Sequence, residues 1–197
     1  ERIYANQRRH GIKIDIGAVS QNYMFIVYEE AINPSSSWEA GALFVGAGYE
    51  NQNGWNDPER AMGAGLYTGY KFKRSPNFYM QRMRYGHIMR GSYIKPNLMI
   101  TTYNYDRIDY DHPPDPVTFM YPTTRETAFA GAAMLEFGNQ LVLSEQLMVE
   151  YSAGFGYGFT TKQVGLNYSN YGFSGGIGTD LAPYVWSFGL KVGYLMK

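Results

Sequence analysis

The chain has 197 residues, a length that fits one domain. Its 17 Lys and Arg balance its 17 Asp and Glu, which argues against nucleic acid as a partner because nucleic-acid-binding surfaces carry excess positive charge. The chain contains no cysteine, so disulfides, thiolate catalysis and cysteine-ligated metals are excluded. Charged residues make up only 17%, against ~25% in typical soluble domains, whereas Gly reaches 23 and Tyr 19. This composition is unusual for a soluble enzyme.

Two membrane signals are missing from the sequence. No stretch reaches the ~18 uninterrupted apolar residues that indicate a transmembrane helix. No basic segment is followed by an apolar one, and the chain begins at Glu1, as a mature chain does after removal of a signal peptide. The remaining structure able to cross a bilayer is a closed β-barrel, in which segments of ~10 residues alternate in hydrophobicity.

Alternation with a period of two predicts eight strands, an even number. The first three are Ile12–Val19, Tyr23–Ile32 and Trp38–Tyr49, of which the second and third alternate less cleanly. The other five are Met62–Phe72, Ile94–Tyr103, Ala128–Phe137, Leu147–Thr160 and Tyr184–Met196.

A soluble barrel or sandwich would alternate too, but its less apolar face would carry many Lys, Glu and Thr. Here that face is mostly Gly, Ala and Ser with about one charge per strand, as Gly189 and Lys191 illustrate opposite Trp186 and Phe188. Small residues fit a narrow lumen, and a continuous apolar face fits lipid. The sequence therefore predicts an all-β, eight-stranded antiparallel up-and-down transmembrane β-barrel. We expect it to form a single domain over residues 1–197, with residues 1–10 as a periplasmic N-terminal tail.

With both termini periplasmic, alternate connectors face outward, and the outer ones should be the longer. The outer connectors are then Ser20–Asn22, Glu50–Arg60, Tyr105–Glu126 and Thr160–Pro183. The inner connectors are Asn33–Ser37, Lys73–Ser92 and Gly138–Gln146. Two depart from the rule, because the first outer connector is very short and the second inner connector is long.

The run IKIDIGAVSQNYMFIVYEEAI, the Gly-rich segment after it and the block FYMQRMRYGHIMRGSYIKPNL resemble small outer-membrane barrels of Bacteroides-type bacteria. These proteins are similar in architecture to the OmpA and OmpX barrels, and Tyr28–Ala31 and Gly91–Pro96 are the most specific pieces. The resemblance implies a Gram-negative outer-membrane protein, exported through a cleaved signal peptide and in contact with lipid and lipopolysaccharide. It implies no reaction and no cofactor.

An eight-stranded barrel has an interior that side chains can fill. Eight charged residues are predicted to face it, four of each sign: Lys13, Asp15, Glu29, Lys71, Lys95, Glu136, Glu150 and Lys191. Balanced signs favour ion pairs that close the lumen, because unpaired buried charge is costly. A gated ion path is the alternative.

Enzymatic outer-membrane barrels need a histidine at the outer rim, beside a nucleophile or a carboxylate. Of the three histidines, His10 falls in the N-terminal tail and His87 in an inner connector, so only His112 is on the correct side. The acidic residues around His112 could form a proton-transfer or divalent-cation site that bridges lipopolysaccharide, or a solvated loop. We expect no catalysis, no metal site and no cofactor.

Aromatic residues near strand ends, such as Trp38, Tyr70, Trp186 and Tyr194, fit the girdles at the two membrane interfaces. Those of the third outer connector fit either a girdle or a binding surface, since tyrosine is favoured in recognition. The candidate surface-loop binding residues are Tyr105, Asp109, Tyr110, Asp111 and His112.

The long inner connector is rich in Arg and aromatic residues. It could be a basic strip against lipid head groups or a docking surface for another envelope protein. The candidate docking residues are Phe78, Tyr79, Arg82, Arg84 and Tyr85. The sequence thus predicts a plugged, non-enzymatic barrel that serves as an accessory or structural subunit of a larger outer-membrane complex. The alternative is a cell-surface binding protein or adhesin that acts through its outer loops.

Overall fold

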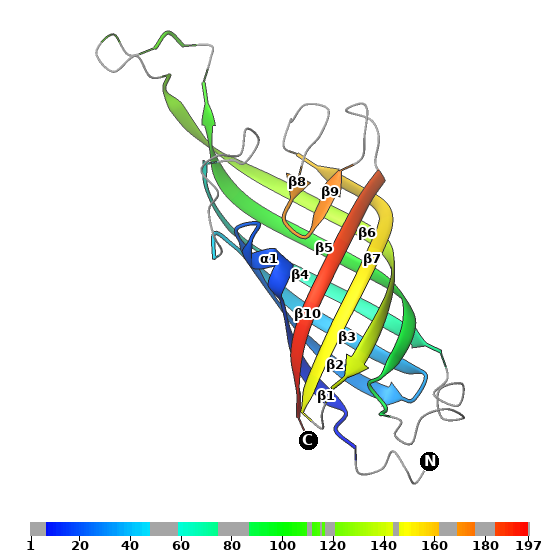
Figure 1. Cartoon of the computed structure of the whole chain (residues 1–197). Helices are drawn as coiled ribbons and strands as arrows, with labels where there is room; N and C mark the ends of the chain where they lie inside the picture. Colours follow the sequence, from blue (N-terminus) through cyan, green and yellow to red (C-terminus); the bar gives the residue numbers. More distant parts are fainter. Residues whose placement is uncertain are drawn as a thin grey trace.

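The computed structural model describes residues 7–47, 59–74, 87–109, 112–114, 116, 121–143, 146–161, 169–175 and 184–196. Within these ranges the chain is almost entirely β, and eight long antiparallel strands close into a barrel (Figure 1). None of the helices in the described residues has the length and apolar character needed to cross a membrane.

Each long strand pairs with its neighbour in sequence, and β1 pairs with β10 to close the barrel, with Lys13 opposite Gly193. The strands are β1 (His10–Asp15), β2 (Tyr23–Asn33), β3 (Ser36–Val45), β4 (Glu59–Lys73), β5 (Gly91–Ile108), β6 (Thr123–Val142), β7 (Leu147–Thr160) and β10 (Tyr184–Met196). β1 begins and β10 ends at one end of the barrel, which we call the terminal end; the opposite end is the distal end (Figure 1). The predicted eight-stranded antiparallel architecture is confirmed.

The strand alternation places apolar side chains outside and charged or small ones inside. On β1, Ile12 and Ile14 are exposed while Lys13 between them is fully buried. The same pattern leaves Leu66 64% exposed and Phe188 75% exposed, whereas most large apolar side chains of water-soluble proteins are buried. Large apolar side chains therefore cover much of the outer wall of the barrel.

The predicted strand Ile12–Val19 is wrong beyond Asp15, where the chain forms the short helix α1 (Ile16–Val19). The Asp15 carboxylate accepts a hydrogen bond from the Gly17 backbone N–H at 3.0 Å, the capping interaction that favours helix initiation. Ala18 turns inward and is buried, whereas Ile16 and Val19 remain exposed. As a result β1 covers only the terminal half of β10, from Lys191 to Met196.

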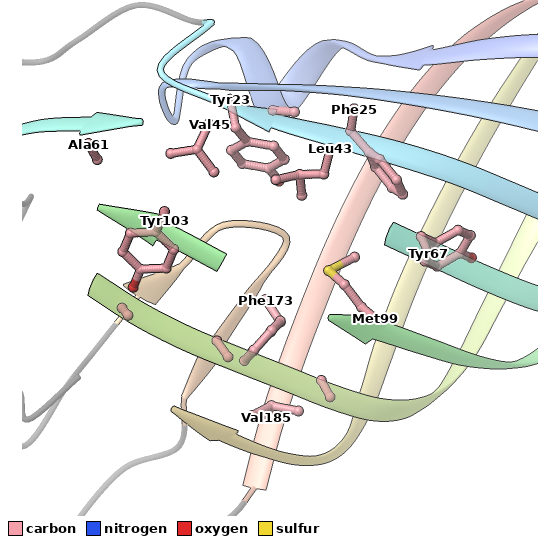
Figure 2. Packing of buried hydrophobic residues seen from close by; sticks show 14 of the residues in the cluster. Tyr23, Phe25, Leu43, Val45, Ala61, Tyr67, Met99, Tyr103, Phe173 and Val185 are labelled. Carbon is pink, nitrogen blue, oxygen red and sulfur yellow. The ribbon is translucent and has the colours of Figure 1, made fainter. Parts of the chain in front are cut away.

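The predicted outer connector Thr160–Pro183 contains a hairpin, β8 (Ser169–Asn170) and β9 (Phe173–Gly175). β9 pairs with Val185 and Trp186 of β10, along the part of β10 that β1 does not reach. Phe173 packs inside the barrel beside Leu43, Met99 and Val185 (Figure 2). Part of this connector therefore fills the lumen, which the alternation did not predict.

The turn of this hairpin depends on a glycine. Gly172 has a φ of +93°, and a Cβ there would lie 2.6 Å from the Met99 sulfur and 3.3 Å from a Leu43 methyl carbon. A larger residue would be strained in this conformation and would also displace its neighbours. Glycine at this position thus allows the hairpin to pack inside the barrel against the side chains of Leu43 on β3 and Met99 on β5.

Other strand boundaries also differ from the prediction. β1 begins at His10, within the predicted N-terminal tail, β3 spans Ser36–Val45 instead of Trp38–Tyr49, and β4 begins at Glu59 instead of Met62. β5 and β6 have 18 and 20 residues and extend past the rest of the barrel at the distal end, so the connector between them shortens to residues 109–122 (Figure 1). At the terminal end β6 continues to Val142. The predicted connector Asn33–Ser37 is shorter in the structure, a tight turn between Asn33 and Ser36. In this turn the Asn33 side-chain oxygen accepts hydrogen bonds from the Ser35 N–H and hydroxyl, each at 2.9 Å.

Candidate functional site: the charge network of the lumen

All eight charged residues predicted to face the lumen lie inside the barrel and are buried. The structure adds Glu39 on β3 and Lys73 on β4 to this set. Among the described residues, five lysines and five carboxylates form the charge network: Lys13, Lys71, Lys73, Lys95, Lys191, Asp15, Glu29, Glu39, Glu136 and Glu150. The network is neutral when all ten groups are ionised.

Two lysines and three glutamates form its centre. The Lys13 ammonium contacts Glu29 at 2.8 Å and Glu150 at 2.6 Å, and it also contacts Glu39. The Lys71 ammonium contacts Glu29 at 3.0 Å and both Glu39 and Glu150 at 2.7 Å. These five side chains come from five different strands, so the network links opposite sides of the barrel.

The other lysines surround this centre. Lys95 contacts Glu39 at 2.9 Å and Glu136 at 2.7 Å. Lys73 contacts Glu29 at 3.2 Å, and Lys191 contacts Glu150 at 3.6 Å. Every lysine of the network therefore has a carboxylate partner. Asp15, the remaining carboxylate of the network, lies opposite Lys191 in the pairing of β1 with β10.

Uncharged polar and aromatic groups complete the hydrogen bonding. The Tyr93 hydroxyl donates to Glu150 at 2.6 Å, the Ser37 hydroxyl donates to Glu29 at 2.6 Å, and Lys71 donates to the Gln140 side-chain oxygen at 2.8 Å. Lys71 also lies 4.3 Å from the centre of the Tyr93 ring, a cation–π distance. Buried charges are tolerated when they are paired and hydrogen-bonded in this way.

Glu29, Glu39 and Glu150 lie close enough together to hold a metal ion, and within the described residues they form the one acidic cluster of this kind. The ammonium groups of Lys13 and Lys71 contact all three carboxylates. A divalent cation between these carboxylates would lie against two positive charges. The geometry therefore supports ion pairing among side chains rather than metal binding.

An apolar layer lies inside the barrel on the distal side of the charge network. Side chains from β2, β3, β4, β5, β6 and β10 meet the tip of the β8–β9 hairpin in this layer (Figure 2). Tyr103 and Tyr171 meet edge to face with ring centres 5.0 Å apart, and Phe25 and Tyr67 do the same at 5.1 Å. The hairpin thus adds side chains where the barrel wall alone would leave space.

A second apolar layer lies at the terminal end. Ile88 and Met89 are fully buried against Ala31, Met148 and Leu195. The Ile88 N–H donates to the Gln7 side-chain oxygen at 2.7 Å, and Lys73 donates to the Ile88 carbonyl at 3.4 Å. The end of the long inner connector is therefore a plug, a role that sequence reasoning missed.

His87 lies at the start of this plug, outside the strands. Its Nδ1 accepts a hydrogen bond from the Met89 N–H at 3.1 Å. Burial, together with smaller contributions from the nearby cations Lys73 and Arg8, lowers the pKa of His87 from 6.5 to about 4. The ring is therefore neutral at neutral pH.

The structure describes only some of the other candidate residues. All five candidate docking residues, from Phe78 to Tyr85, lie outside the described residues, as do Tyr110 and Asp111. Tyr105 points inward, is buried, and donates to Glu126 at 2.9 Å, so its assignment to a surface binding loop is wrong. His112 is exposed and lies 2.7 Å from the Asp109 carboxylate.

Sequence reasoning missed Glu39 because its strand alternates weakly, with apolar residues on both faces. Glu39 is directly opposite Glu29, and residues opposite each other in a sheet point to the same side. The turn alone does not predict this pairing, because a register counted from Asn33 opposite Ser36 would set Glu39 opposite Glu30. An irregularity between Ala31 and Asn33 shifts the register by one residue, and this shift has no signal in the sequence.

Comparisons with known proteins give this chain no family. No family model, no curated protein and no solved structure matches it. What the lumen does is therefore inferred from its own residues and distances.

Replacing Glu39 with glutamine should lower the free energy of unfolding by about 3–5 kcal/mol, because the change leaves buried lysine charge uncompensated. The double variant Glu39→Gln/Lys13→Met should recover part of this loss, since Lys71 still contacts Glu29 and Glu150. Urea unfolding followed by tryptophan fluorescence measures both. Glu30→Gln is the matched control, because Glu30 lies outside the lumen, where it accepts a hydrogen bond from Trp38. Equal losses for Glu39→Gln and Glu30→Gln would contradict the structural role of the network.

His87 should make the barrel less stable in acid. The unfolded chain takes up a proton near pH 6.5, whereas the folded chain resists protonation until about pH 4. The contribution of His87 to the free energy of unfolding is therefore complete above pH 6.5 and is lost as the pH falls toward 4. Urea unfolding across this range should show a steeper decline for the wild type than for His87→Gln. Identical pH profiles would show that His87 is not held neutral by the plug.

Proposed function

We propose that the protein is a non-enzymatic, integral outer-membrane β-barrel with a sealed lumen, acting as an accessory or structural subunit of a larger envelope complex. One combined observation carries this proposal. The interior is filled by the charge network and closed by apolar layers on both sides, while the exterior presents large apolar side chains. Such a barrel acts through its outer surface rather than through its lumen.

The exterior supports insertion into a bilayer. The outward positions carry no charge over five described segments: Met62–Phe72, Ile94–Thr102, Phe129–Phe137, Leu147–Phe159 and Tyr184–Tyr194. An uncharged apolar band of this kind is what hydrocarbon requires of a barrel surface. Exposed Tyr70, Trp186 and Tyr194 fit the aromatic girdles. The resemblance to small outer-membrane barrels supports the same location, with lipid and lipopolysaccharide as neighbours.

A partner protein is the further element of the proposal. A filled lumen offers no path for a substrate, and the inner connector Lys73–Ser92 is longer than a turn between two strands requires. Its basic and aromatic residues are of the types enriched in the cores of interfaces. We therefore place the contact with an envelope protein at Phe78, Tyr79, Arg82, Arg84 and Tyr85.

Gentle detergent extraction followed by affinity isolation and mass determination tests this function. We expect a stoichiometric partner that is lost from the Arg82→Ala/Arg84→Ala variant but kept by Arg125→Ala. Arg125 is a suitable control because its side chain is 55% exposed at the far end of β6. Heat-modifiable migration of each variant on a gel shows that the barrel is still folded. A lone folded barrel would contradict the subunit role.

One observation favours the alternative, a cell-surface binding protein or adhesin. β5 and β6 extend beyond the other strands at the distal end, so their ends project from the rest of the barrel (Figure 1). Exposed Tyr121 and His112 lie in this region. Loss of cell-surface binding after removal of residues 109–122, with the partner still bound, would favour the adhesin.

A further inference from the structure

The outer wall of the barrel contains a groove that is separate from the lumen. It has a volume of about 710 Å³ and crosses six neighbouring strands, from Trp38 on β3 to Tyr184 on β10. Trp38 lies near the terminal end of the barrel and Tyr184 at the distal end of β10. The groove therefore runs obliquely from one end of the wall to the other, and no charged residue lines it.

The strand register defines the two sides of the groove. One side is a row of directly paired residues, Thr68, Leu98, Ala133 and Tyr157. The opposite side lies two residues away on each strand and is formed by Tyr70, Pro96, Leu135 and Phe155. Ala133 and Pro96 are short among bulky neighbours, and this difference in size produces the hollow.

The floor lies between these two rows. It includes Gly69 and Gly156, which contribute no side chain, and Asn97 and Met134, which point into the barrel. Beside it the pairing of β4 with β5 is interrupted. Gly69 pairs with Asn97, and Phe72 pairs with Ile94. Between these two pairs, Tyr70 and Lys71 of β4 form no backbone pair with Pro96 and Lys95 of β5. Proline has no N–H to donate, so Pro96 weakens the ladder at the centre of the groove.

The width and length of the groove determine what it can hold. Rows two residues apart are separated by ~6.8 Å, because a strand rises ~3.4 Å per residue. An α-helix with its side chains is ~10–12 Å wide and would rest on the rims. Six strands at ~4.8 Å spacing give a length of about 24 Å. A narrow, long and uncharged groove fits an extended hydrocarbon chain.

We propose that this groove binds one acyl chain of a membrane lipid as a defined site. The inference rests on the membrane insertion proposed above and adds to it a specific lipid ligand. Aromatic residues at the two ends of the groove, Trp38 and Tyr184, carry the polar N–H and O–H groups that suit the interfacial region. The lipid head group then lies at one of these ends.

Photolabelling tests the site in the full-length barrel. The barrel is reconstituted in phosphatidylethanolamine vesicles that contain a small fraction of the same lipid with a diazirine on its palmitoyl chain. After irradiation, tandem mass spectrometry locates the cross-links. We expect them to concentrate on the groove residues of β5, β6 and β7, and to fall when an excess of unlabelled dipalmitoyl lipid is added.

A leucine at position 133 would fill the groove, so Ala133→Leu should reduce the labelling about tenfold. Ala64→Leu is the matched control, because Ala64 is an exposed outward alanine of β4 that does not line the groove. Vesicle flotation and heat-modifiable migration confirm that each variant is inserted and folded.

The outcomes separate this inference from the proposed function. Diffuse labelling around the inserted barrel, unchanged by Ala133→Leu, would overturn the groove site and leave membrane insertion intact. A folded barrel that does not enter vesicles would overturn the proposed function and the lipid ligand together. Release of a co-isolated protein by Ala133→Leu, without loss of labelling, would assign the groove to that protein instead.

Discussion

The pairing of buried lysines with buried carboxylates is the constraint on which the rest of the barrel depends. Eight strands enclose little more than the volume of their own inward side chains, so each ammonium must find its carboxylate inside that space. Lys13 and Lys71 meet this requirement by sharing Glu29, Glu39 and Glu150 across the lumen. The shared contacts fix the relative positions of strands that are distant in the sequence. Such a network adds specificity to the fold, because a shifted register would separate the charges.

The apolar layers follow from the same constraint. Ion pairs gain strength when they are shielded from solvent, and this lumen is shielded on both sides. On the terminal side Ile88 and Met89 supply the cover, and on the distal side the β8–β9 hairpin does so. The hairpin also takes the place beside β10 that β1 leaves when it ends at Asp15. A short first strand and an inserted hairpin are therefore two parts of one closure.

Much of this architecture could be predicted from the sequence, since two-residue alternation directly reports which side chains face outward. It predicts all eight of the charged residues named above as inward-facing, and all eight are buried in the lumen. The features it missed have no such periodic signal. α1 continues the apolar spacing of Ile12 and Ile14, and only the Asp15 cap distinguishes it from a strand. β9 has three residues, too few to alternate, and Ile88 is buried by residues distant in the chain.

We propose that side chains seal the lumen of an inserted barrel. Single-channel recording in a planar bilayer tests it most directly, with vesicle flotation used to show that the protein has inserted. We predict no stepwise conductance from the wild-type barrel above that of the bare bilayer. The variant Phe173→Ala/Ile88→Ala, which removes bulk from both apolar layers, should conduct more readily than the wild type. A steady open channel in the wild-type barrel would contradict the account.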